Sequence, residues 1–264
     1  MEDLNKEIEK VATDALSEYI LNRVTLIGDG SGNLLRIGNR KFIITCLHVA
    51  NIFHGKGFKE IILRGNIKIP SDKIKLVAST ENLDKGKEEK DQLDIAVFEF
   101  NEELRFEENE NLFYTIDDFE IIENFKDYNW ELTDLILSGY PEAIILKFGK
   151  DKYYSPFTLT TVPIQDINNE TFVFGKYPKG NVHKYNKTEL PIELFAPYGI
   201  SGAFILKDKT FTGPHSELWF PHKAKIVAIQ GSYSEKGKFI KGTNIKYLFE
   251  LLDKIGLFIS KDSL

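Results

Sequence analysis

Three short segments of the chain carry residue types that can do chemistry together. His48 follows the apolar run Phe42-Ile43-Ile44-Thr45-Cys46-Leu47, Asp94 opens the run Ile95–Phe98, and Ser201 stands in the turn Gly199-Ile200-Ser201-Gly202. An imidazole, a carboxylate and a hydroxyl can act as general base, orienting group and nucleophile. Each segment alone is a weak signal, because a histidine after a strand is usually structural and Gly-X-Ser-Gly is a common tight turn.

The order of the three residues is more informative than any one of them. His, then Asp, then Ser is one of three known chain orders for a serine-hydrolase triad, and it is the order used on double-barrel β folds. This order predicts His48 and Asp94 in a first β half and Ser201 in a second. The site would then lie in the cleft between the two halves.

The elements that must position these residues are mostly short strands. Apolar residues recur at helical spacing over residues 4 to 20, which predicts an N-terminal amphipathic helix. Short apolar runs separated by turn residues then predict strands. The predicted strands are Arg23–Ile27, Asn33–Ile37, Lys41–Cys46, Lys59–Leu63, Lys73–Ala78, Leu93–Phe100, Leu135–Tyr140, Ala143–Phe148, Tyr153–Thr161, Thr171–Phe174, Gly202–Leu206, Ala224–Ile229 and Lys238–Ile240.

A second amphipathic helix is predicted near the C-terminus, over residues 245 to 255. Thr243 is its expected N-cap and Gly256 its expected end. The pattern as a whole is all-β in two halves, without the alternating βαβ units of a Rossmann or α/β-hydrolase sheet. The expected divisions are an N-terminal helix over 1–22, a first β half over 23–115, a second over 116–241, and a C-terminal helix and tail over 242–264.

The three motifs in register resemble those of trypsin-like, chymotrypsin-fold serine peptidases of the disulfide-free bacterial kind. Thr45-Cys46-Leu47-His48-Val49 matches the histidine motif of that family, and Asp94-Ile95-Ala96 matches its aspartate strand. Gly199-Ile200-Ser201-Gly202 matches the nucleophile turn, with Ala203 in place of the last glycine. The resemblance covers roughly residues 23 to 255 and implies two six-stranded antiparallel β-barrels.

The resemblance also implies a role for each matched residue. Ser201 would attack the scissile carbonyl, His48 would take and return its proton, and Asp94 would orient the imidazole. The backbone N–H groups of Gly199 and Ser201 would form the oxyanion hole. A glycine at position 199 suits a turn whose torsions a Cβ would resist.

Further positions are expected to bind substrate as an added strand. Gly231, Ser232 and Tyr233 match the family strand that pairs with the residues before the cleaved bond. Phe195 lies six residues before Ser201, where relatives have the base of the specificity pocket. Without a carboxylate there, the pocket is expected to prefer small or apolar side chains over Lys or Arg.

Two departures from the family pattern leave an alternative open. Ala203 and Phe204 replace a glycine and a common proline, and residues 210–223 form a long insertion before the substrate strand. A crowded turn after Ser201 would leave the oxyanion hole unformed. The main hypothesis is a serine endopeptidase, and the alternative is a catalytically silent pseudo-peptidase that binds proteins. An α/β-hydrolase esterase is rejected, because its nucleophile elbow requires a glycine at position 203, where this chain has Ala203.

Composition limits the remaining possibilities. The 264 residues carry a net charge of −6, which argues against nucleic acid as a partner. The single cysteine, Cys46, rules out an intrachain disulfide and a cysteine-built zinc site, and we expect it to be buried filler. No metal, cofactor or membrane contact is expected. A cytoplasmic peptidase acting on protein or peptide substrates is anticipated, narrow in its targets and controlled by a partner protein or a signal.

Overall fold

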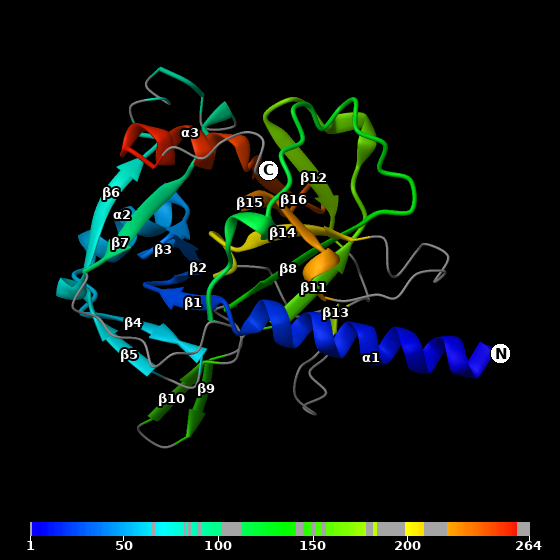
Figure 1. Ribbon diagram of the computed structural model, residues 1–264, viewed down its shortest axis with the longest axis horizontal. Helices are drawn as coiled ribbons and strands as arrows, with labels where there is room; N and C mark the ends of the chain where they lie inside the picture. Colours follow the sequence, from blue (N-terminus) through cyan, green and yellow to red (C-terminus); the bar gives the residue numbers. More distant parts are fainter. Residues whose placement is uncertain are drawn as a thin grey trace.

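The computed structural model places two curled antiparallel β-sheets side by side, with helices packed around them (Figure 1). It describes residues 2–64, 67–81, 83, 86–88, 91–101, 112–140, 145–148, 151–154, 157–177, 182–183, 199–208 and 221–257. Phe195 and residues 210–220 of the predicted insertion lie outside the described residues.

The first sheet contains the strands before residue 101, in the order β5-β4-β1-β2-β3-β7-β6. Each strand is antiparallel to its neighbours. Most neighbours are consecutive in the chain, but β4 pairs with β1 and β7 pairs with β3 through longer connections. Its strands are β1 (Val24–Ile27), β2 (Gly30–Ile37), β3 (Arg40–Thr45), β4 (Glu60–Leu63), β5 (Ile67–Pro70), β6 (Ile74–Ser79) and β7 (Ala96–Phe100).

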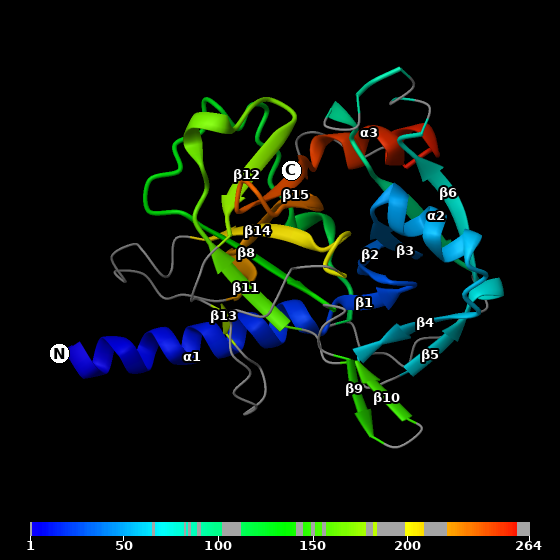
Figure 2. The same ribbon diagram turned by 180° about the vertical axis from the view of Figure 1, so that it is seen from behind.

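The second sheet has the order β12-β16-β15-β14-β8-β11-β13 and is also antiparallel. Its strands are β8 (Asp134–Gly139), β11 (Phe157–Thr161), β12 (Phe172–Lys176), β13 (Val182–His183), β14 (Phe204–Asp208), β15 (Lys225–Ser234) and β16 (Phe239–Asn244). A separate hairpin of β9 (Ile145–Phe148) and β10 (Asp151–Tyr154) projects from the body, as both ribbon views show (Figure 2).

Three α-helices complete the described fold. They are α1 (Glu2–Leu21), α2 (Leu47–Gly55) and α3 (Lys246–Lys254). Helix α1 packs against the second sheet and leads directly into β1 of the first sheet, while α3 follows β16 and returns to the first sheet beside β6 (Figure 1). Both terminal helices therefore tie one half of the molecule to the other.

Each half of the molecule has its own hydrophobic core. The larger core lies in the first sheet and continues under α1 and α3, with Phe42, Phe98 and Leu248 among its fully buried side chains. The second core fills the other sheet, with Leu137 and Val227 among its members. The two-barrel, all-β fold class expected from the sequence is thus confirmed. Each sheet contains seven of the named strands rather than six.

Three local predictions need correction. Helix α2 was not predicted, because the apolar residues of β3 and α2 form one continuous run that hides the change of period. Thr243 is not the N-cap of α3: it lies within β16, its hydroxyl donates to the Leu93 carbonyl at 2.6 Å, and Ile245 is the N-cap. Strand β2 begins at Gly30, inside the stretch interpreted as a turn.

Candidate active site

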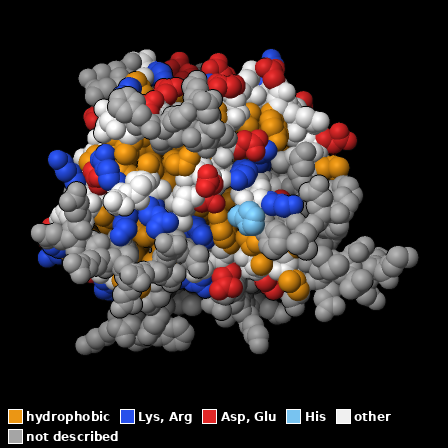
Figure 3. Space-filling view, in the orientation of Figure 1, with side chains coloured by type: hydrophobic (Ala, Val, Ile, Leu, Met, Phe, Trp, Pro, Cys, Tyr) orange, Lys and Arg blue, Asp and Glu red, His pale blue; other side chains and the backbone are white. Residues whose placement is uncertain are grey.

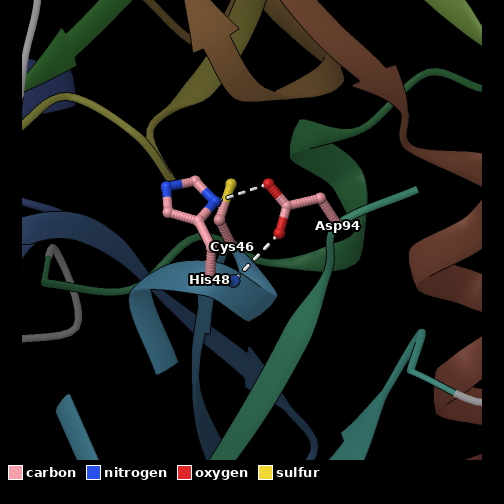
Figure 4. A group of neighbouring side chains, drawn as sticks. All are labelled: Cys46, His48 and Asp94. Carbon is pink, nitrogen blue, oxygen red and sulfur yellow. Dashed lines mark hydrogen bonds and ion pairs between the residues drawn. The ribbon is translucent and has the colours of Figure 1, made fainter. Parts of the chain in front are cut away.

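The pair of His48 and Asp94 is the best-defined feature of the site. His48 lies in the first turn of α2, and its Nδ1 is 2.6 Å from Asp94 Oδ2 (Figure 4). The backbone N–H of His48 donates to the other carboxylate oxygen, Oδ1, at 3.0 Å. One carboxylate thus holds both the ring and the backbone of the histidine. Because Nδ1 carries the shared proton, Nε2 is left as the basic nitrogen.

Asp94 is placed by an unusual backbone conformation just before β7. Its φ of 55° lies in the left-handed region, which is strained for a residue with a side chain. Burial acts to raise the pKa of Asp94, but the hydrogen bonds and charge of His48, together with the Cys46 thiol, lower it below its usual value. The carboxylate therefore stays ionised beside the imidazole.

Cys46 is buried, as the sequence analysis expected, but it also supports the site. Its Sγ donates to the Gln230 carbonyl at 3.1 Å, and it lies beside Asp94. The thiol, the His48 ring and the Asp94 carboxylate offer atoms that all lie within 4.8 Å of one another. Burial, with the charge of Asp94, raises the pKa of the thiol well above its ordinary value, so it remains protonated. A protonated thiol is a poor metal ligand, and we assign the group to hydrogen bonding.

Ser201 stands in a turn that only glycine-flanked backbone can make. Gly199 and Gly202 have φ values of 92° and 96°, in the region that L residues avoid. A Cβ at Gly202 would also collide with the Ser31 carbonyl oxygen and the Thr45 hydroxyl. The turn is therefore packed directly against β2 and β3 of the first sheet.

Hydrogen bonds from the first sheet hold this turn in place. The backbone N–H of Ser31 donates to the Ser201 carbonyl at 2.9 Å, and the Ser31 hydroxyl donates to the Gly199 carbonyl at 2.8 Å. The Asn33 side-chain amide donates to the Gly202 carbonyl at 2.7 Å. Ser31 and Asn33 were missed from the sequence. Polar residues inside a fully buried strand were the signal that could have identified them.

The N–H groups proposed for the oxyanion hole belong to Gly199 and Ser201. Among the described residues, neither the Gly199 N–H nor the Ser201 N–H has a hydrogen-bond acceptor. Both residues line the same groove as His48. Two unpartnered N–H groups on either side of one residue can stabilise a developing negative charge.

A groove of about 920 Å³ brings the sequence-predicted residues together. It is lined by His48, Asp94, Gly199, Ser201, Gly231, Ser232 and Tyr233. Within the described chain, the Ser201 hydroxyl donates to the Gly231 carbonyl at 3.4 Å, and the His48 hydrogen bonds go to Asp94. The serine and the histidine therefore face one groove without a bond between them.

The substrate-strand residues lie on a partly open strand edge. Strand β14 pairs with β15 only as far as Ile229, whereas β16 continues to pair with β15 up to Ser234. Ser232 and Tyr233 are thus paired with β16 on one side, and Gly231 is the bulged residue between Gln230 and Ser232. All three line the groove. An extended peptide could add to this edge.

The two departures from the family pattern are packed away from the groove. Ala203 is buried and hydrogen-bonded on both sides, through its N–H to Ile200 and its carbonyl to Gln230. Phe204 is buried in the first core, where its ring packs against those of Tyr114 and Phe119. Neither residue lines the groove, and neither occupies the position of the free N–H groups.

The surface carries charges of both signs. On the face shown in Figure 3, lysine and arginine side chains are interspersed with aspartate and glutamate. Of the helices in the described residues, none combines the length and hydropathy that a membrane crossing requires.

Comparison with known proteins shows the fold. No protein-family model and no curated protein sequence matches the chain. Among solved structures, it is similar to a Glu endopeptidase in complex with MPD, at 14% identity and a TM-score of 0.54, over 90% of this chain and 91% of that one. An inactive form of the Rv3671c protease aligns at 10% identity and a TM-score of 0.48, over 93% and 95%. The serine protease domain of the Sesbania mosaic virus polyprotein aligns at 11% and 0.40, over 88% and 92%. The order of the strands and the likeness to the Glu endopeptidase together show that this chain has the chymotrypsin-like two-barrel fold.

Proposed function

We propose that the protein is a serine endopeptidase with Ser201 as nucleophile, His48 as general base and Asp94 as orienting carboxylate. One observation carries this proposal. The His48–Asp94 pair lines a single groove with Gly199 and Ser201, whose N–H groups have no acceptor among the described residues. General base, nucleophile and oxyanion donors in one concave site are the parts that acyl transfer requires.

The hydrogen bonds assign the direction of proton transfer. Asp94 holds the His48 ring with the proton on Nδ1, so Nε2 is the atom that accepts the Ser201 proton. The imidazolium that forms is stabilised by the ionised carboxylate, whose pKa is lowered in this site. His48 then returns the proton to the leaving amine.

Ser201 must exchange one hydrogen bond before it attacks. Its bond to the Gly231 carbonyl is long, at 3.4 Å, and is therefore weak. Rotation of the hydroxyl toward His48 Nε2 when substrate binds gives the nucleophile its base, as catalytic hydrogen bonds often tighten in the bound complex. The developing oxyanion is stabilised by the N–H groups of Gly199 and Ser201.

The substrate is a peptide in extended conformation. We expect it to lie along β15 at Gly231, Ser232 and Tyr233, which line the groove with Ser201, so that its scissile carbonyl comes beside Ser201. A strand-like substrate is consistent with the named activity of the Glu endopeptidase that shares this fold.

Labelling with a fluorophosphonate probe tests the proposal. The probe reacts with a serine hydroxyl that is activated by a neighbouring base. We therefore expect the wild-type protein to be labelled and the Ser201→Ala variant to remain unlabelled. His48→Ala is expected to lose labelling as well, because the hydroxyl then has no base.

Ser232→Ala is the matched control, since it removes another hydroxyl from the same groove. Labelling that persists in Ser201→Ala would contradict the assignment of the nucleophile. Absence of labelling in the wild-type protein, under conditions where it is folded and binds peptides, would favour a protein-binding module instead.

A further inference from the structure

A second groove, which we call the Trp130 groove, lies at the other end of β8 from the candidate active site. It has a volume of about 530 Å³, and its lining includes Tyr128, Trp130, Glu131, Leu132 and Val162. Strand β8 begins beside this groove at Asp134 and ends at Gly139, where a Cβ would collide with Ile200 of the nucleophile turn. At about 3.4 Å per residue, the two ends of the strand are roughly 17 Å apart. The two grooves share no lining residue, so the Trp130 groove is a separate surface.

Leu132 has an unfavourable backbone conformation in this groove. Residues 130–133 form a turn in which the Thr133 N–H donates to the Trp130 carbonyl at 3.1 Å. Leu132 is the third residue of the turn, and its φ is 53°. Glycine or asparagine is usual at a turn position with positive φ, because a bulky side chain is strained there. The chain thus has a leucine where the backbone favours other residues.

The same leucine is exposed to solvent. Leu132 is 49% exposed and belongs to neither hydrophobic core, and Val162 of the same lining is 48% exposed. Ile167, at 42%, lies two residues beyond Gln165, which also lines the groove. Single exposed apolar residues are common, but a group of them around a concave surface is typical of a site that binds a partner. Because strain and exposure both lower stability, folding alone does not explain Leu132.

The aromatic residues of the groove present ring surface rather than free polar atoms. The rings of Tyr128 and Trp130 are in contact, with their centres 4.7 Å apart. The Trp130 Nε1–H donates to the Phe125 carbonyl at 2.9 Å, and the Tyr128 hydroxyl accepts from Lys207 Nζ at 2.6 Å. Since these polar atoms already have partners, the groove suits an apolar group.

Glu131 is the charged side chain in the lining of the groove. It is exposed, and its carboxylate has no ion pair or hydrogen bond with the part of the chain that the structure describes. Lys207 is already paired with Glu120 at 2.6 Å. Lysine and aspartate residues occur nearby in equal number, without lining the groove: Lys126, Lys176, Asp127 and Asp166. The groove therefore combines an apolar lining with one negative charge that attracts a cation.

We infer that the Trp130 groove is a docking surface for a segment of a partner protein that presents a large apolar side chain beside a lysine or arginine. The apolar side chain packs against Leu132 and the aromatic rings, and the basic residue pairs with Glu131. Binding then buries the exposed leucine, which offsets the cost of holding it in a strained conformation. This inference goes beyond the proposed peptidase activity and does not depend on it.

Selection from a library of random peptides displayed on phage tests the inference. The target is the full chain with Ser201→Ala, so that peptides are not cleaved. The same protein with Leu132→Asn added removes phage that bind elsewhere, including at the candidate active site. The remaining peptides are expected to contain Trp, Phe, Leu or Met with Lys or Arg as a nearest or next-nearest neighbour. No enrichment over the Leu132→Asn protein, or enriched peptides without this pattern, would overturn the inference.

Fluorescence anisotropy with a labelled peptide from this selection measures the contribution of each group. Leu132→Asn is expected to weaken binding by at least about 10-fold, as the loss of an anchor residue does. Glu131→Lys is expected to weaken it by about threefold or more, with a larger effect at low salt. Unchanged affinity in either variant would contradict the partner chemistry that we infer.

Ile67→Asn and Glu250→Lys are the matched controls for these two variants. They change an exposed isoleucine in β5 and an exposed glutamate in α3, outside the groove. Both are expected to bind the peptide like the Ser201→Ala parent. An equal loss of affinity in a control and its matched variant would show that binding is not specific to the Trp130 groove.

Thermal denaturation separates docking from a structural role. Asparagine adopts positive φ more readily than leucine, so the Tm of Leu132→Asn is expected to be no lower than that of the wild type. A lower Tm would show that the fold itself needs the leucine. Light scattering at increasing protein concentration is expected to give the same mass for the wild type and Leu132→Asn. Self-association that disappears in Leu132→Asn would assign the groove to a second copy of this chain and overturn the inference.

Discussion

The hydroxyl of Ser31 donates a hydrogen bond to the carbonyl of Gly199 at 2.8 Å, across 168 residues of sequence and from one sheet to the other. The same hydroxyl accepts the backbone N–H of Tyr140 at 2.9 Å. One buried side chain thus fixes the peptide that follows Gly199, and with it the turn that presents the candidate oxyanion N–H groups. The first sheet therefore supports the candidate site through this turn, in addition to the pair of His48 and Asp94.

Ser31→Ala is expected to reduce both stability and turnover. The substitution leaves the Tyr140 N–H and the Gly199 carbonyl buried without this partner, which costs about 1–3 kcal/mol in the free energy of unfolding. The loosened turn is expected to lower kcat by about 10-fold or more. Urea denaturation and steady-state kinetics measure the two effects. Ser71→Ala, at a half-buried serine away from the groove, is the control, and an unchanged kcat in Ser31→Ala would contradict the role of the turn.

Gly202→Ala is expected to prevent the native turn from forming. A Cβ there collides with the Ser31 carbonyl and the Thr45 hydroxyl, and the φ of 96° is unfavourable for alanine. A loss of about 3 kcal/mol or more in unfolding free energy, or failure to fold, should be seen by thermal denaturation. Gly55→Ala is the comparison, because a Cβ at Gly55 meets nothing within 4 Å. Equal stability of the two variants would contradict the conclusion that the Ser201 turn has no room for a Cβ at position 202.

The thiol of Cys46 is expected to assist Asp94 through hydrogen bonding. Cys46→Ala removes the donor to the Gln230 carbonyl and one of the groups that lower the pKa of Asp94. A decrease in kcat of about fivefold is expected, equivalent to about 1 kcal/mol. Cys46→Ser should retain most of the activity, since a hydroxyl can donate in the same place. If serine and alanine reduce kcat equally, packing rather than hydrogen bonding explains the residue.

Asp134 is expected to make the protein less stable as the pH rises. Burial, and then the nearby charge of Asp208, raise the pKa of Asp134 from 3.8 to about 6. Between about pH 4 and pH 6 the unfolded chain ionises this group while the folded protein keeps it protonated, so the free energy of unfolding falls over that range. Asp134→Asn should remove this slope and add about 1–2 kcal/mol to the free energy of unfolding at pH 7.

Urea denaturation from pH 4 to pH 8 measures this slope. Glu235→Gln changes an exposed carboxylate and should leave the pH dependence as in the wild type. A slope that survives in Asp134→Asn would assign the pH dependence to another group.

Much of this fold could be read from patterns that act over short distances. The predicted strands Lys41–Cys46 and Leu135–Tyr140 coincide closely with β3 and β8. This is because buried strand positions require apolar residues, which produce a recognisable pattern in the sequence. The end of α3 at Gly256, with its φ of 80°, was likewise predictable from local backbone preference. Helix α2 was not, since its buried residues continue the apolar run of the preceding strand.

His48, Asp94 and Ser201 could be proposed as base, orienting group and nucleophile from the sequence, because chemistry restricts which residue types can serve in these roles. Their surroundings could not. Ser31 and Asn33 hold the Ser201 turn from another sheet, and the buried amide of Gln230 has no hydrogen-bond partner among the described residues. Such relationships join residues far apart in sequence, and no local propensity encodes them. These hydrogen bonds form only when the two sheets pack together, because burial then determines which polar groups find a partner and which do not.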